Sequence, residues 1–302
     1  MTPSLLDRLL AQDAINFTLT NRIPRRWLTR VVGRISRAEH PVVRDVSLAL
    51  WQHFGGDLHL EEAARRDFAS VHDCFIRALK PGARPIDPDP GVLVSPCDGI
   101  VGAMGTVKRS QLFQAKGSRY TLDELLGRVD GTPFEGGNYV TLRLTSTMYH
   151  RFHAPADLRL TSTTFIPGEL WNVNPVTVRR IPRLYCRNER AVLETTTAAG
   201  HPLLLVAVGA VLVGSIHVHA VGQSLNQEYG GPFHLPCNAL ATKGEELGYF
   251  HHGSTIIAIT APGLTPAAGI TSGATVRMGQ ALFVGDMERR GHVDAPHCIE
   301  TV

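Results

Sequence analysis

The chain has 302 residues, of which 43% are hydrophobic, and a formal net charge of +3. This length and composition allow a substantial core in one large domain with a helical appendage, and the small net charge argues against nucleic acid as a partner. The five cysteines are odd in number and form no Cys-x-x-Cys pair, which argues against a disulfide framework or a cysteine zinc site and indicates a reducing, cytoplasmic compartment.

An arginine-rich amphipathic helix is predicted over residues 25 to 37. Its apolar residues recur at helical spacing, its arginines take the complementary face, and Pro24 suits its start. Such a helix either lies among lipid headgroups or packs its apolar stripe on the main domain, and the pattern leaves both interpretations open. A cytoplasmic anionic membrane surface would attract the six arginines between Arg22 and Arg37.

Any contact with a membrane is expected to be peripheral. The N-terminus lacks the layout of a signal peptide, and the longest apolar run, Leu203 to Val213, is shorter than the roughly 20 residues needed to span a bilayer. We therefore expect at most a peripheral contact, on the cytoplasmic side of a membrane.

Two more helical patterns precede the point at which the sequence changes from helical to β periodicity. The first runs from Val43 to Phe54 and stops before Gly55-Gly56, and the second begins after Ser70, a plausible N-cap, and carries Val71 to Leu79. Prolines between Pro81 and Pro90 then end the helical region.

The remainder of the chain predicts mainly β structure. Short alternating runs such as Tyr139 to Leu144 are separated by Gly, Pro and Asn turns, with one helical interruption at Leu122 to Leu126. The fold class is therefore α+β: a mainly antiparallel β body preceded by N-terminal amphipathic helices. We divide it into a helical, membrane-associating region at residues 1–85 and a β-rich domain at 86–302.

Three separate motifs hold residues able to activate a hydroxyl. Ser254 follows Gly253 and precedes a β-branched run, Asp98 lies in a turn after an apolar strand, and His150 and His153 follow the strand that ends at Leu144. Each motif alone is compatible with ordinary turn or strand chemistry. Together they supply a nucleophile, a base and an acid that orients the base.

Two histidine pairs have spacings that occur in metal sites. They are His150 with His153 and His217 with His219. Neither pair has a third ligand at a characteristic spacing, so we expect no metal, and we interpret His217 and His219 as belonging to a strand with one solvated face.

Several short blocks stand in the order found in one enzyme family. They are Phe75 to Pro81, Arg84 to Ile86, Ser95 to Gly99, Gln114 to Gly117, Tyr149 to Pro155, Pro167 to Leu170, Asn188 to Arg190, Val213 to Ile216, Lys243 to Gly248, and Gly253 to Thr255. Through these blocks the sequence resembles the pyruvoyl-dependent phosphatidylserine decarboxylases from about Ser70 to Gln280.

The resemblance implies a proenzyme that cuts itself between Gly253 and Ser254. Ser254 Oγ, deprotonated by His153 with Asp98 behind it, would attack the Gly253 carbonyl and convert the amide to an ester. Elimination would then leave a dehydroalanine, which loses ammonia to become a pyruvoyl group at position 254. A β chain of residues 1–253 and an α chain of residues 254–302 would result. Glycine at 253 removes the Cβ that would crowd this attack.

The same resemblance implies the activity. The pyruvoyl group would form a Schiff base with phosphatidylserine and accept the electrons released as CO₂ leaves, giving phosphatidylethanolamine. His150 would reprotonate the product carbanion, with His153 also able to take part. The family further implies a homodimer of the cleaved αβ unit and C-terminal strands reminiscent of biotinyl/lipoyl folds.

The sequence departs from the family next to the cleavage site. His252, preceded by His251, stands where the family usually has leucine. These histidines either alter the pH range of self-cleavage or point to solvent, and we favour solvent. Two competing hypotheses remain: a Ser-His-Asp lipid hydrolase with an intact chain, and a non-catalytic lipid-binding protein.

Overall fold

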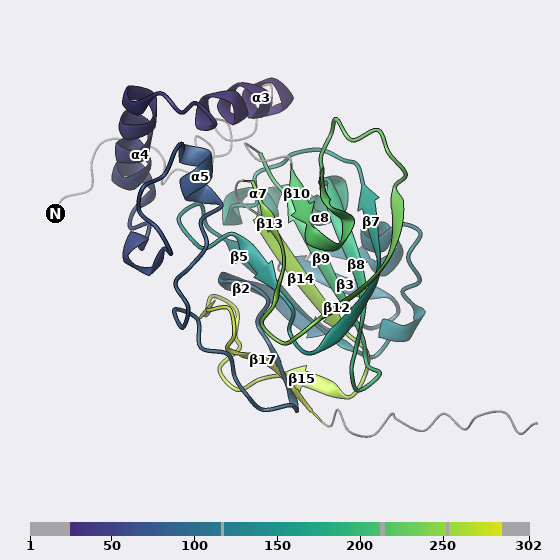
Figure 1. Ribbon diagram of the computed structural model, residues 1–302. Helices are drawn as coiled ribbons and strands as arrows, with labels where there is room; N and C mark the ends of the chain where they lie inside the picture. The colour runs from purple at the N-terminus through teal and green to yellow at the C-terminus, as the bar shows by residue number, and fades with distance from the viewer. Residues whose placement is uncertain (1–24, 116–117, 212–214, 252–253, 286–302) are drawn as a thin grey trace, which may run out of the picture.

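The computed structural model of the protein describes residues 25–115, 118–211, 215–251 and 254–285 (Figure 1). An antiparallel β body follows a group of N-terminal helices, which confirms the predicted fold class. The predicted cleavage bond, with Gly253 and the neighbouring His252, lies outside the described residues.

An eight-stranded sheet forms the centre of the body. Its strands are, in spatial order, β12 (His234–Ala241), β7 (Leu158–Ile166), β8 (Arg190–Thr197), β9 (Pro202–Gly209), β14 (Ser254–Thr260), β5 (Asn138–Leu144), β2 (Gly99–Thr106) and β16 (Thr275–Val276). Every residue of β14 is buried, as suits a β-branched, apolar run in the middle of a sheet covered on both faces.

Two smaller sheets cover one face of the main sheet. They are β11 (Gln223–Leu225), β10 (Ile216–Val218), β13 (Glu246–Phe250) and β6 (Arg151–His153), and β1 (Val92–Val94), β17 (Ala281–Gly285) and β15 (Leu264–Pro266). Ile256 and Ala258 of β14 pack on this side in one core cluster with Phe152 and Phe250 of the four-stranded sheet.

Short helices and a hairpin cover the other face. They are α6 (Leu122–Leu126), α7 (Pro175–Arg180), α8 (Leu184–Arg187), the hairpin of β3 (Gln111–Ala115) and β4 (Ser118–Thr121), and, in an adjoining loop, η2 (Thr132–Phe134). The other 3₁₀ helix in the body, η3 (His219–Val221), connects β10 and β11 of the four-stranded sheet. Ile257 and Ile259 belong to the core on this side. The prediction of a helix at Leu122–Leu126 is confirmed, and Thr121 caps it in a capping box with Glu124.

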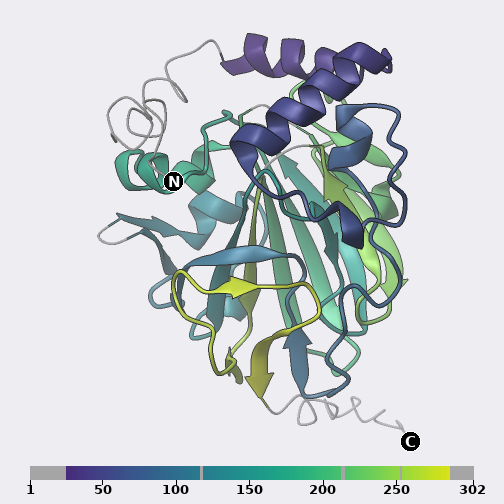
Figure 2. The same cartoon turned by 90° about the vertical axis from the view of Figure 1, so that its left-hand side faces the viewer.

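The N-terminal helices lie at one end of the main sheet in both views (Figures 1 and 2). They are α3 (Arg25–Ser36), α4 (Pro41–Gly55), η1 (Leu60–Glu62) and α5 (Val71–Phe75). Helix α4 has no buried residue. Its apolar side chains spaced four apart are each more than half exposed: Val42, Val46, Leu50 and Phe54.

Helix α5 begins as predicted but is shorter than expected. Ser70 is its N-cap and accepts a hydrogen bond from the Asp73 amide. The helix ends at Phe75, and Leu79 lies beyond it because residues 78 to 80 pair through their backbone with residues 62 to 64.

Candidate active site

The chain crosses from the four-stranded sheet to the main sheet at the predicted nucleophile. Strand β13 ends at Phe250, and β14 begins at Ser254. Ser254 lies opposite Leu144 of β5 and Gly209 of β9. Its side chain is fully buried, and its Oγ has no hydrogen-bond partner among the described residues. A buried hydroxyl without a partner is costly, and Ser254 shares this property with Thr255 beside it.

A carboxylate lies on the same face of the sheet as Ser254. The Gly209 amide donates to the Glu189 carbonyl at 2.9 Å, so Glu189, Gly209 and Ser254 form one row across three strands. A Cβ at Gly209 would be 3.2 Å from Glu189 Oε1. Because opposite residues in paired strands share a face, glycine at 209 leaves room for the buried Glu189 side chain beside Ser254.

His150 is held next to the segment that leads to Ser254. Its carbonyl accepts from the Phe250 amide at 3.0 Å, and its Nδ1 is 2.8 Å from the Met148 carbonyl oxygen. Since a carbonyl only accepts, Nδ1 carries the proton and Nε2 is the unprotonated nitrogen. Nε2 is buried and has no described partner.

The surroundings of His150 keep it neutral. The Phe75 ring lies 4.0 Å away, centre to centre, and the histidine is fully buried. Burial lowers the pKa of His150 to about 3, with the nearby Arg77 charge acting in the same direction. His150 is therefore a neutral imidazole with its basic nitrogen available.

His153 has both ring nitrogens engaged. Nδ1 is 2.9 Å from the Gly244 carbonyl oxygen, and Nε2 is 2.9 Å from the Tyr149 hydroxyl. Nδ1 therefore donates, and Tyr149, whose pKa is raised by burial, donates to Nε2. Burial also lowers the pKa of His153, while the Gly244 carbonyl and the Glu246 and Asp98 charges oppose that effect.

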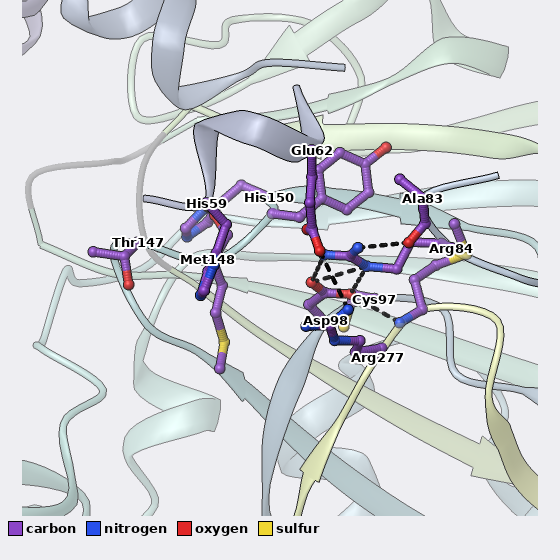
Figure 3. A network of polar contacts seen from close by, with 12 residues as sticks. His59, Glu62, Ala83, Arg84, Cys97, Asp98, Thr147, Met148, His150 and Arg277 are labelled. Carbon is purple, nitrogen blue, oxygen red and sulfur yellow. Dashed lines mark hydrogen bonds and ion pairs between the residues drawn. The ribbon is translucent and has the colours of Figure 1, made fainter. Parts of the chain in front are cut away.

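Asp98 is paired with arginine rather than with histidine. Its carboxylate accepts from Arg84 Nε at 2.9 Å and Nη2 at 2.6 Å, and from the Met278 amide at 2.9 Å. Arg84 also pairs with Glu62 at 2.7 Å and lies between the two acids (Figure 3). This bidentate pairing raises the pKa of Arg84 despite its burial.

The expected direct contact of Asp98 with His153 is therefore not part of this arrangement. A charged, two-pronged guanidinium binds a carboxylate more strongly than a neutral imidazole does. The two residues are still neighbours, because the His153 amide donates to the Pro96 carbonyl, two residues before Asp98, at 2.8 Å. No hydrogen bond between described residues joins Ser254 to either histidine.

The preference for a solvent-exposed His251 was wrong. Its ring stacks on His72 at 4.9 Å, its Nδ1 is 3.2 Å from His72 Nε2, and its Nε2 is 3.1 Å from Ser224 Oγ. Only 8% of His251 is exposed, and burial, together with His72 and other cationic neighbours, lowers its pKa to about 3. His217 is half-exposed on β10 between buried neighbours, as interpreted, but His219 lies outside that strand, because β10 ends at Val218 and η3 begins at His219.

An apolar cavity of about 620 Å³ lies between this end of the main sheet and the N-terminal helices. Trp51, Phe54 and Phe75 line it from the helical side, and Leu144 and Ala210 line it from the strand ends that flank Ser254. Sequence reasoning did not identify this cavity, the Tyr149 hydroxyl or the Arg84 partner. The sequence blocks Tyr149 to Pro155 and Arg84 to Ile86 contain Tyr149 and Arg84 and could have pointed to them.

Comparison with known proteins gives one consistent result. A sequence model described as phosphatidylserine decarboxylase matches residues 71–284. A "Phosphatidylserine decarboxylase proenzyme" of Shewanella baltica (strain OS155 / ATCC BAA-1091) is 38% identical over 284 residues, covering 89% of this chain and 96% of that protein. Proteins of the same name from Shewanella putrefaciens (strain CN-32 / ATCC BAA-453) and Shewanella sp. (strain ANA-3) are each 37% identical over 284 residues, covering 89% of this chain and 97% and 96% of their own lengths.

Proposed function

The chain belongs to the phosphatidylserine decarboxylase family, and on that premise we propose that it is a proenzyme that cuts itself between Gly253 and Ser254. Its activity is that of a carboxy-lyase converting phosphatidylserine to phosphatidylethanolamine. The observation that carries the proposed cleavage is the fully buried Ser254 hydroxyl, without a described partner, at the crossing between two sheets.

The side chains around Ser254 suit the activation of its hydroxyl. Burial favours the neutral form of His150 and His153, the carbonyl partners hold the proton of each ring on Nδ1, and a neutral imidazole can accept the serine proton. We assign this acceptance to His153 Nε2, which would have to give up the hydrogen bond from the Tyr149 hydroxyl, with the nearby Asp98 charge favouring the protonated imidazole. The attack of Ser254 Oγ on the Gly253 carbonyl turns an amide into an ester. Elimination then frees the Gly253 carboxylate and leaves a dehydroalanine at position 254, whose imine tautomer is hydrolysed by water to a carbonyl and ammonia.

The position of Ser254 also fits a pyruvoyl group. The buried Ser254 Oγ has no described hydrogen-bond partner. Conversion of residue 254 to a pyruvoyl group would therefore break no described side-chain hydrogen bond. Once formed, this group supplies an electrophilic carbonyl that takes up the electron pair released as CO₂ leaves. We assign to His150 Nε2 the proton transfer at the carbon that loses CO₂, since this buried nitrogen has no described partner.

The lipid substrate would enter at the end of the molecule that carries the N-terminal helices. No helix in the described part of the chain is long and apolar enough to cross a membrane. The exposed stripe of α4, defined by Val42, Val46, Leu50 and Phe54, continues into the apolar cavity through Phe54. We propose that residues 1–85 place this end on the cytoplasmic surface of the inner membrane, with the acyl chains reaching the cavity.

Two assignments rest on family membership alone. We propose that residues 86–302 form the catalytic domain and that the cleaved αβ unit is a homodimer. Sedimentation equilibrium of the purified protein tests the second assignment, and a monomer mass would refute it.

Intact-mass analysis tests self-cleavage. We expect two fragments, residues 1–253 and 254–302, with the smaller one blocked to Edman degradation. Ser254→Ala should give one inactive, full-length chain, whereas the control Ser272→Ala, at an exposed residue, should cleave normally. A wild-type protein that decarboxylates phosphatidylserine as a single intact chain would refute the proposal.

A further inference from the structure

One partly buried arginine near the candidate site lacks a protein partner. Six arginines with described side chains are buried or half-buried, and five of them bind a carboxylate or a backbone carbonyl: Arg44, Arg77, Arg84, Arg151 and Arg190. The sixth is Arg143. No described residue forms a hydrogen bond or an ion pair with its side chain.

The charge of Arg143 is not balanced by the groups around it. Burial lowers its pKa, and the titratable neighbour that opposes this effect is Tyr185. Tyr185 is itself neutral at pH 7, because burial raises its pKa. An unpaired guanidinium in such surroundings costs free energy unless an anion binds to it.

Arg143 stands between two cavities. It lines the cavity of about 620 Å³ described above and a second cavity of about 520 Å³ that is also lined by Gln114, Tyr185 and Arg179. Val173 is the other residue common to both. The fork of donors on a guanidinium suits two oxygens of one anion, and both cavities have room beside it.

Arg143 is also close in register to the cleavage position. It lies opposite Thr255, and the next residue, Leu144, lies opposite Ser254. Successive residues of a strand point to opposite faces, yet both Arg143 and Leu144 line the larger cavity. That cavity therefore extends around the end of β5, from the strand ends that flank residue 254 to the side of the sheet that Arg143 faces.

We infer that Arg143 binds the phosphodiester of the lipid headgroup, an inference that rests on the proposed function. The headgroup offers two anions, the serine carboxylate and the phosphodiester. Pairing an arginine with the carboxylate would stabilise the charge that must disappear as CO₂ leaves, and so would oppose the reaction. The phosphodiester keeps its charge throughout, so Arg143 can bind substrate and transition state equally.

Steady-state kinetics on the processed enzyme test this role. With a short-chain, monomeric phosphatidylserine, Arg143→Gln should self-cleave normally and raise KM about tenfold or more, with kcat within about threefold of wild type. Arg143→Lys should recover part of the loss, since it keeps the charge without the fork. The control Arg128→Gln, at an exposed residue outside both cavities, should match wild type. An unchanged KM in Arg143→Gln would overturn the inference.

A binding measurement keeps the inference testable without cleavage or decarboxylation. Glycerophosphocholine carries the phosphodiester but no primary amine, and its binding to full-length Ser254→Ala protein can be followed by calorimetry. Adding Arg143→Gln should weaken it about tenfold or more, and inorganic phosphate should compete poorly because it lacks the esterified oxygens. Equal affinities of glycerophosphocholine with and without Arg143, or stronger binding of free phosphate, would overturn the assignment to a lipid phosphodiester. Absence of cleavage in the wild-type protein would instead refute the proposed function.

Discussion

Replacing His150 should separate self-cleavage from decarboxylation. With a pKa of about 3, only about one His150 side chain in 10⁴ is protonated at pH 7 before substrate binds. The resting imidazole is therefore a proton acceptor, and it can act as a donor only after the reaction gives it a proton. We expect that proton to be returned to the carbon that has lost CO₂.

His150→Gln is the sharpest form of this perturbation. The glutamine amide can still donate to the Met148 carbonyl, now 2.8 Å from Nδ1, but it has no basic nitrogen in place of Nε2. Loss of a positioned acid–base group typically costs about 10²–10⁴-fold in rate. We therefore expect kcat to fall by about 10²–10⁴-fold, with normal self-cleavage and little change in KM.

Two assays on the same preparation check this expectation. Intact mass reports the extent of cleavage, and CO₂ release from phosphatidylserine in mixed micelles reports kcat and KM. His234→Gln, at an exposed position of strand β12, is the matched control and should behave as wild type. Accumulation of uncleaved His150→Gln protein would show that His150 serves the cleavage step, and a cleaved variant with kcat within threefold of wild type would refute its role in decarboxylation.

Three further predictions concern the support of the site. Arg84→Gln leaves the buried Asp98 carboxylate without its cation and should destabilise the fold by about 3 to 5 kcal/mol. The control Arg277→Gln, which removes the more exposed pair with Glu62, should cost less than about 1 kcal/mol. Equal shifts of the melting temperature in the two variants would contradict this. The pKa of His251 is depressed to about 3, so the unfolded chain binds the extra proton between about pH 6.5 and 3, and stability falls as the pH drops through that window. Urea titrations at several pH values would measure the free energy of unfolding. In His251→Gln, its decrease with falling pH should be smaller than in wild type by up to about 1.4 kcal/mol per pH unit, and an unchanged pH dependence would refute the burial of a neutral imidazole. Leu50→Asp should weaken co-sedimentation with anionic vesicles without changing kcat on a monomeric short-chain lipid, because Leu50 is exposed on α4 and is not among the residues that line the apolar cavity. Undiminished vesicle binding would argue that α4 does not contact lipid.

Local sequence signals predicted the elements better than the contacts between them. Ser70 and the sequence Leu122 to Leu126 specify a helix start and a short helix through neighbouring residues, and both were predicted correctly. The early end of α5 was not predictable, because it depends on backbone pairing with residues 62 to 64, which the tertiary fold brings alongside.

The candidate site was predictable as a set of residues but not as a set of pairs. The blocks containing Asp98, His150, His153 and Ser254 were recognisable. The structure places His150 beside Phe250, next to the crossing that leads to Ser254, and His153 opposite Glu246 at the other end of β13. The partner of Asp98 depends on competition between several donors, which only the assembled fold decides. That Arg143 has no acidic partner among the described residues is likewise visible only in the assembled fold.

The central position of β14 determines how active molecules of the proposed mature enzyme can be produced and replaced. Residues 254–285 contribute β14 between β5 and β9, β16 beside β2, and β17 between β1 and β15. A break before Ser254 leaves all these ladders intact, so the two chains stay interlocked and have no ordinary dissociation equilibrium under native conditions. Separately synthesised chains would have to insert a middle strand into a finished sheet. The number of active molecules is therefore fixed by how many precursors are translated and folded, and a molecule that loses its reactive group can only be replaced.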